Sequence, residues 1–223
     1  MWAWKVLAGS LMLTALLASC ATGMSGRNAE VTPDAYGRAK ETHALVLMSV
    51  DWGRRWGFCS VENVQLRTFA FDRIPIQKQG DDEAADLIME APPSLLAGPG
   101  AVVHYALLVE PGEYALSFSE LKAARSVNDV ATYRAGRRKL IQDDKPLAGS
   151  FKVGRGELVY VGHFGLECVN GQPTIWRYYV EGREGFQHYL TTRVKAKYPF
   201  LDTEKAQYKL FRTSVIGRDY ELR

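Results

Sequence analysis

Residues 101–119 read AVVHYALLVEPGEYALSFS, and this stretch carries the clearest structural pattern in the chain. Apolar side chains occupy every second position before Pro111-Gly112, and the same period of two resumes after it. Proline followed by glycine fits the central positions of a type II turn, because proline fixes φ and glycine accepts a positive φ. Type II geometry does not match the twist of a tight two-residue hairpin. We therefore expect the two strands to splay and to belong to different sheets.

Further runs of strand length stand on both sides of this stretch. Residues 43–52 are almost continuously apolar, and the imperfect alternation of residues 58–71 predicts a bulge within a longer strand. Residues 150–167 repeat the strand–turn–strand pattern, and Asn170-Gly171 is a hairpin signal before residues 174–180. Many short strands between glycine and proline turns predict a mainly β fold, an antiparallel β-sandwich of about seven to eight strands.

One amphipathic helix is expected near the C-terminus, over residues 183–197. Its apolar stripe follows helical spacing, and Pro199 ends it. Residues 120–146 fit either a helix or short strands, and we favour irregular β structure; residues 202–215 stay open. The stripe consists of Phe186, Tyr189, Leu190 and Val194.

Residues 72–100 are the least regular part of the chain. They hold four prolines and the acidic run Asp81-Asp82-Glu83, with a short helix expected over residues 83–90. A connection of this length inside a compact domain is often functional. We therefore mark residues 72–100 as a candidate docking loop.

The N-terminus has the order of a secretory signal: a charged start at Lys5, an apolar run from Val6 to Leu17, then small residues and a cysteine. The run is shorter than the roughly 20 apolar residues that an uncleaved anchor needs. Leu17-Ala18-Ser19-Cys20 resembles the lipobox of bacterial lipoproteins. That resemblance implies diacylglyceryl transfer to the sulfur of Cys20, cleavage before it, and acylation of the new amine. The expected organisation is a signal peptide over 1–19, a flexible tether over 20–41 and a single domain over 42–223.

Composition limits the classes of function. Hydrophobic residues make up 47% of the chain and charged residues 24%, which is enough for a packed core. The formal net charge of +3 argues against a dedicated nucleic-acid binder. If Cys20 carries lipid, Cys59 and Cys168 remain, and in an oxidising compartment they form either one disulfide or two unrelated buried thiols.

No motif for catalysis or metal binding is visible. The four histidines show no metal-ligand spacing, no nucleophile elbow is present, and we name no catalytic, cofactor or metal residue. Trp176, Tyr178 and Tyr179 beside Arg177 are a conceivable sugar or peptide platform, although strand aromatics more often belong to a core. The basic pairs Arg54-Arg55 and Arg137-Arg138 fit either lipid headgroups or solvated loops.

Several runs together resemble a group of uncharacterised proteobacterial lipoproteins. The resemblance covers roughly residues 43–200 and implies a prealbumin-like or carboxypeptidase-regulatory-like β-sandwich in the cell envelope. Ala21 rather than Asp after Cys20 implies the outer membrane, facing the periplasm. Its motifs are structural, so it brings no active-site residue. The runs are 107–116 (LLVEPGEYAL), 149–151 (GSF), 156–162 (GELVYVG) and 197–200 (KYPF), together with the lipobox.

The expected function is therefore that of a non-enzymatic, membrane-anchored envelope lipoprotein. Its partners would be membrane lipid, through the acyl anchor, and an envelope protein or glycan. One alternative is an accessory or assembly factor that docks through residues 72–100. Another is a hydrolase whose site only forms in three dimensions.

Overall fold

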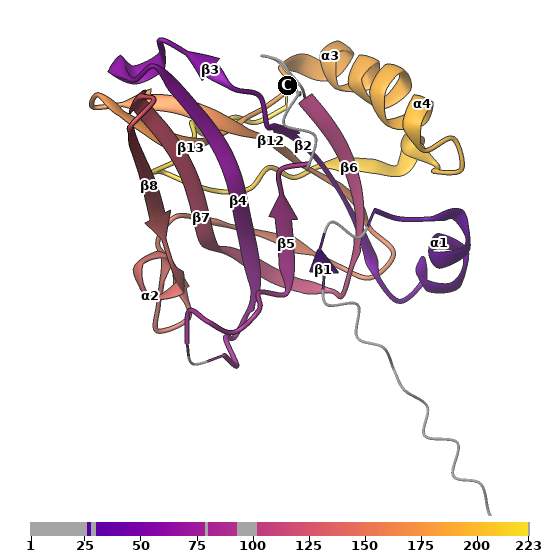
Figure 1. Cartoon of the computed structure of the whole chain (residues 1–223). Helices are drawn as coiled ribbons and strands as arrows, with labels where there is room; N and C mark the ends of the chain where they lie inside the picture. The colour runs from indigo at the N-terminus through magenta and orange to yellow at the C-terminus, as the bar shows by residue number, and fades with distance from the viewer. Residues whose placement is uncertain (1–25, 28–29, 79, 93–101, 223) are drawn as a thin grey trace, which may run out of the picture.

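Backbone pairing joins most of the strands into two β-sheets that pack face to face (Figure 1). The computed structural model describes residues 26–27, 30–78, 80–92 and 102–222. The first sheet, sheet A, follows the order β1 (Gly26–Arg27), β5 (Leu87–Glu90), β4 (Asn63–Ile74), β7 (Gly112–Ser126) and β11 (Ser150–Val153), with β3 (Arg55–Trp56) on β4 and β8 (Asp129–Ala135) on β7.

The second sheet, sheet B, follows the order β13 (Gln172–Tyr178), β12 (Leu158–Val169), β2 (Ala44–Asp51) and β6 (Val102–Val109), with β14 (Ala206–Tyr208) on β12. Most pairings are antiparallel, but β2 and β14 both run parallel to β12. A small hairpin, β9 (Ile141–Gln142) with β10 (Lys145–Pro146), stands apart. The predicted mainly β sandwich is confirmed, and within the described residues its two sheets have seven and five strands, of which β1 and β3 are only two residues long.

The Pro111-Gly112 turn separates the two sheets as expected. β6 ends at Val109 in sheet B, and β7 begins at Gly112 in sheet A. The inner faces of both sheets meet in one apolar core, in which Trp52 is fully buried and its Nε1 donates to the hydroxyl of Tyr105 at 2.8 Å. The rings at the centre contact one another edge-on or tilted, and they belong to Phe69, Phe71, Phe151, Phe164 and Phe211.

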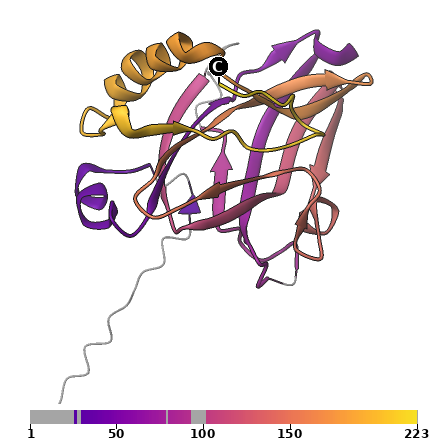
Figure 2. The same cartoon turned by 180° about the vertical axis from the view of Figure 1, so that it is seen from behind.

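The expected C-terminal helix covers the outer face of sheet B. It comprises α3 (Gly182–Tyr189), the π-helical turn η2 (Leu190–Val194) and α4 (Lys195–Lys197). Its predicted stripe is buried against Leu45, Leu47 and Tyr160. Figure 2 shows this helix from behind, on the same side of the molecule as α1 (Pro33–Ala39).

The segment expected to be a flexible tether up to residue 41 is structured over much of its length. Gly26 and Arg27 pair with β5, and Glu30 forms a bridge with Leu107. Helix α1 is capped by Thr32, whose Oγ1 accepts from the amide of Ala35 at 3.2 Å. The prediction was wrong for residues 30–41 because the seven-residue helix that begins at Pro33, directly after its cap Thr32, carries no apolar periodicity of its own.

The predicted irregular segment is shorter than expected: among the described residues, 75–78 and 80–86 form neither strand nor helix, whereas 72–74 and 87–90 are strand. β4 continues to Ile74, and β5 pairs with it where a helix was expected over residues 83–90. Leu87 and Met89 are buried while Ile88 and Glu90 are less so, which is the period of two of a strand. Residues 93–101, the remainder of the expected docking loop, lie outside the described residues.

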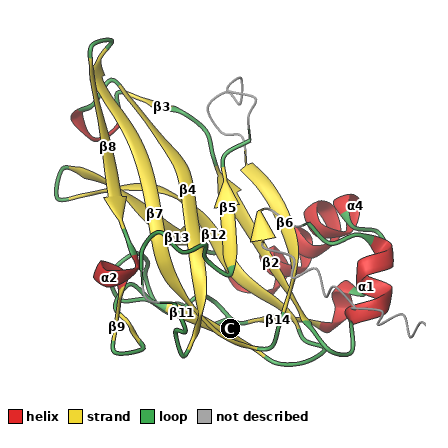
Figure 3. Ribbon diagram, turned by 60° about the horizontal axis from the view of Figure 1, so that its bottom comes forward, coloured by secondary structure: helices red, strands yellow, loops and turns green. Residues whose placement is uncertain are grey.

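Residues 120–146 are mostly strand, as favoured. β7 turns at Val127-Asn128 into β8, and a four-residue helix, α2 (Arg137–Leu140), precedes the β9–β10 hairpin. Figure 3, viewed with the bottom of the molecule forward, shows β8 at one margin of sheet A and α2 below it.

Candidate binding surface

An apolar surface lies at one end of sheet A, on the face that points away from the core. Trp56 pairs with Asn63, Asn63 with Ala124, and Ala124 with Val130. Directly opposed residues point to the same side of a sheet, so the side chains at the two ends of this row share a face. Trp56 is 64% exposed and Val130 57%. We call Trp56, Val130 and the 91% exposed Val127 of the adjoining turn the distal apolar surface.

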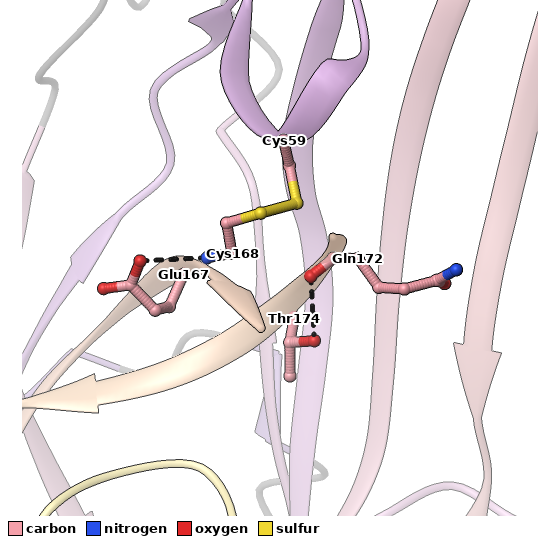
Figure 4. Close-up of a disulfide and its surroundings, with 5 residues drawn as sticks. All are labelled: Cys59, Glu167, Cys168, Gln172 and Thr174. Atoms are coloured by element: carbon pink, nitrogen blue, oxygen red, sulfur yellow. Dashed lines mark hydrogen bonds between the residues drawn. A yellow bond between two sulfur atoms is a disulfide. The ribbon is translucent and has the colours of Figure 1, made fainter. Parts of the chain in front are cut away.

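A disulfide fixes the loop that carries this surface. Cys59, in the turn η1 (Phe58–Ser60), and Cys168, in β12, have sulfur atoms 2.08 Å apart and Cα atoms 5.4 Å apart (Figure 4). Gly57, Cys59 and Ser60 have φ of 62°, 59° and 60°, a region that residues other than glycine rarely adopt. The bond therefore ties a loop of unusual backbone geometry, next to Trp56, onto sheet B.

Arg55, one of the two arginines before Trp56, is fixed by contacts with Asp51 and Phe58. The guanidinium of Arg55 pairs with Asp51 and lies 5.6 Å from the ring centroid of Phe58. Asp51 also accepts from the amide of Gly53 at 3.0 Å. These contacts orient the short strand β3 and leave the indole of Trp56 facing outward.

A buried ion pair anchors the other end of sheet A. Asp72, whose side chain is 1% exposed, accepts from Nε of Arg137 at 2.7 Å and from Nζ of Lys78 at 2.7 Å. Burial raises the pKa of Asp72, but the hydrogen bonds from Arg137 and Lys78 outweigh it, so the pKa lies below its usual value. Arg137 was expected on a solvated face; it is buried because it neutralises Asp72.

This ion pair also holds the connection between β4 and β5 in place. The amide of Asp86 donates to Asp72 at 3.1 Å, and Arg137 donates to the carbonyl of Glu83 at 3.0 Å. Two hollows, of about 330 and 220 Å³, are lined by polar and apolar residues of the connection together with residues of the neighbouring strands. The predicted docking segment is thus pinned to the sheet between residues 72 and 86.

A serine–histidine pair under the C-terminal helix resembles a nucleophile with its base. Ser49 Oγ is 2.7 Å from Nδ1 of His104 and 3.2 Å from the hydroxyl of Tyr189. Ser49 is fully buried, however, and the charges that act on His104 are the cations Arg193 and Lys197. A catalytic pair needs an accessible nucleophile and is usually oriented by a carboxylate. The pair therefore supports packing of the helix, not hydrolysis.

The aromatic residues in and directly after β13 are partly buried. Trp176 packs against the core, Arg177 is 1% exposed, and the hydroxyl of Tyr178 donates to the carbonyl of Leu166 at 2.7 Å. Tyr179 stacks on Tyr220 with ring centroids 4.3 Å apart. Trp176 and Tyr178 thus share the partly exposed face of β13, whereas Tyr179 is taken up by its stack with Tyr220. Trp56, which sequence reasoning passed over, is the exposed aromatic, and its place between two glycines (Gly53, Gly57) was the only local signal.

The described residues hold neither a metal-binding cluster nor a membrane-spanning helix. Across the described ranges, no group of three or more histidine, cysteine, aspartate or glutamate side chains is placed to hold a metal ion. Within those ranges no helix has the length and apolar character needed to cross a bilayer. Cys20, the predicted lipidation site, lies outside the described residues. Comparison of the chain with protein-family models, curated proteins and solved structures found no match.

Proposed function

We propose that this chain is a lipoprotein of the bacterial cell envelope, anchored by acyl groups on Cys20, whose β-sandwich binds an envelope protein or glycan through the distal apolar surface. The proposed location is the outer membrane, facing the periplasm, since Ala21 follows Cys20. No catalytic step is assigned to the domain.

One observation carries the binding role: Trp56 is 64% exposed on a loop that a disulfide holds in place. Tryptophan is costly to expose and is enriched at the centres of protein interfaces. Its indole face also suits stacking on a sugar ring. A rigid backbone lowers the entropy cost of binding, because the loop is ordered before the partner arrives.

Site-specific photocrosslinking in the native membrane tests the proposal. A photoreactive residue at position 56 or 130 should form adducts with one partner, whereas the same residue at Val215, 57% exposed elsewhere on the surface, should not. Trp56→Ala should abolish the adduct formed from position 130 and leave the melting temperature within about 2 °C, because an exposed side chain contributes little to stability. Equal adducts from position 215 would sink the assignment of this surface.

A glycan partner is tested separately. Fluorescence of the wild-type protein should respond to soluble cell-wall glycan fragments, and Trp56→Phe should remove most of the response, because among the other tryptophans of the described residues Trp52 is fully buried and Trp176 is partly buried against the core. A response that survives Trp56→Phe would exclude the surface as a glycan site.

A further inference from the structure

The stretch of chain between the proposed anchor and the folded domain is short. Gly26 is the first residue with a described contact, pairing with Leu87, and it stands six positions after Cys20. An extended chain covers at most about 3.5 Å per residue, so the Cα atom of Cys20 lies within about 21 Å of that of Gly26. This inference rests on the lipid anchor proposed above.

The direction in which the chain leaves the domain follows from strand pairing. β1 runs parallel to β5, so the residues before Gly26 head toward the end of sheet A at which β5 begins. β5 is antiparallel to β4, so that is also the end at which β4 finishes at Ile74. The Pro111-Gly112 turn lies there too, since Ile74 pairs with Glu113. We call Ile74–Ile76 with Pro111-Gly112 the proximal end.

The register places Gly26 along the length of the sandwich. Gly26 is level with Leu87, Leu87 with Phe71, and Phe71 with Leu116 of β7. At about 3.3 Å per residue, Leu116 stands roughly 13 Å from the start of β7 at Gly112 and roughly 33 Å from its end at Ser126. The distance of roughly 13 Å from Gly26 to the proximal end is thus more than half of the maximum reach of about 21 Å between Gly26 and Cys20.

We propose that the proximal end lies against the headgroups of the bilayer that holds Cys20 and that the distal apolar surface points away from it. The lipid-facing surface is the apolar tip Ile74–Pro75–Ile76, in which Pro75 is exposed and both isoleucines are partly exposed. Two ion pairs flank the tip, Arg73 with Glu110 and Lys78 with Asp86, and the exposed carboxylate of Asp144 accepts from the amide of Ile76 at 2.7 Å. An apolar tip with both cations paired and a carboxylate beside it suits a zwitterionic headgroup layer and needs no anionic lipid.

The consequence is a fixed presentation of the binding surface. β7 spans the sandwich from the proximal turn to the turn that carries Val127, a distance of roughly 46 Å at 3.3 Å per residue. The distal apolar surface is therefore held about 45 Å from the bilayer, where it meets a partner and not the membrane of its own anchor.

Energy transfer to labelled lipid tests this orientation. The acylated full chain is purified from its native membrane and reconstituted into phosphatidylcholine vesicles that hold a small fraction of rhodamine-labelled lipid. A donor dye is attached to Gln77→Cys or to Val127→Cys, both exposed positions. Cys59 and Cys168 are bonded to each other, and Cys20 is alkylated, so the introduced thiol reacts alone. We expect transfer at least threefold more efficient from position 77 than from position 127.

The other possible results would overturn either the orientation alone or the orientation together with the lipid anchor. Equal transfer from the two positions, or more from position 127, in protein of acylated mass overturns the orientation alone. An unacylated mass overturns the anchor and the orientation together. Inserting about twenty glycine and serine residues before Gly26 lets the domain tumble away from the bilayer and should bring the two efficiencies together. A threefold difference that survives the insertion would mean that the short tether does not set the orientation.

Discussion

At the scale of single residues, the stability of the fold depends on two buried polar sites, His163 and the ion pair of Asp72 with Arg137. His163 contacts Tyr160 and Tyr189 under the C-terminal helix, and its Nδ1 is buried without a hydrogen-bond partner among the described residues. Asp72 and Arg137 are buried together on sheet A. A buried histidine must stay neutral, whereas a buried carboxylate must stay paired.

Stability should fall as the pH is lowered from about 6.5 toward 4. Burial, with a smaller effect of nearby His104, lowers the pKa of His163 to about 4, and burial with Arg193 and Lys197 lowers that of His104. Between the folded pKa and the unfolded value near 6.5, the unfolded chain binds more protons, so acid favours unfolding by up to about 3 kcal/mol for His163. Urea unfolding at stepped pH measures this.

His163→Phe keeps a ring between the two tyrosines and removes the titrating group. It should flatten the stability profile between pH 6.5 and 4, whereas His188→Gln, on the exposed face of the helix, should leave the profile unchanged. A wild-type slope in His163→Phe would contradict the role given to His163.

Arg137→Met should destabilise the protein by about 3 kcal/mol, because it leaves the Asp72 carboxylate buried with Lys78 as its one remaining cationic partner among the described residues. The neighbouring Arg138 provides a matched control, since its side chain is 82% exposed and its ion pair with Asp81 lies at the surface. Arg138→Met should cost less than about 0.5 kcal/mol. Similar losses in the two variants, measured by urea unfolding, would refute the importance of the buried pair.

At the scale of elements, the disulfide joins the loop after β3 to sheet B, a connection that strand pairing does not provide. β3 pairs with β4 through two residues only, and the loop that follows contacts sheet B through Cys168. The C-terminal helix, by contrast, is held by an extended apolar stripe on sheet B. The β3 loop is therefore the element most dependent on one covalent bond.

The double variant Cys59→Ser/Cys168→Ser should lose stability by up to about 4–5 kcal/mol, the chain-entropy value for a closed loop of about 110 residues. Urea unfolding of wild type and variant measures the loss. In the wild type, thiol labelling of denatured, unreduced protein should find neither cysteine free. Full labelling of both without reductant would show that the bond is absent from the native protein.

At the scale of the whole molecule, the N-terminal segment joins the margins of both sheets before the chain enters β2. It pairs with β5 of sheet A at Gly26 and bridges β6 of sheet B at Glu30, and Lys197 of the helix pairs with Glu30 at 2.9 Å. A force applied at the N-terminal segment is therefore transmitted to both sheets and to the C-terminal helix. This fits a domain that is held at one end and binds at the other.

Cys20→Ala should move the protein from the detergent-extracted membrane fraction to an unanchored or unprocessed form, because the acyl groups supply the proposed attachment. Membrane fractionation with intact mass measurement checks this; the parent should have the mass of residues 20–223 plus acyl groups. Cys59→Ser/Cys168→Ser, which removes the other two cysteines, should stay with the membrane. Unchanged fractionation of Cys20→Ala would rule out the lipid anchor.

Local pattern predicted those features whose cause lies within a few neighbouring residues. The period of two around Pro111-Gly112 predicted two strands in different sheets, and the stripe of Phe186, Tyr189, Leu190 and Val194 predicted the helix. The same approach failed for residues 83–90, where helical spacing of apolar residues competed with pairing to β4, and the tertiary pairing prevailed.

By itself, the sequence determined the fold class, the sheet assignment of β6 and β7, and the C-terminal helix, because spacing and turn chemistry act over short distances. Only the tertiary structure decided that β2 lies parallel to β12, that Arg137 is buried on Asp72, and that Trp56 is exposed in register with Val130. The physical reason is that each of these three contacts joins residues 65 to more than 100 positions apart in the sequence. Such residues come together only when the two sheets pack around their shared core.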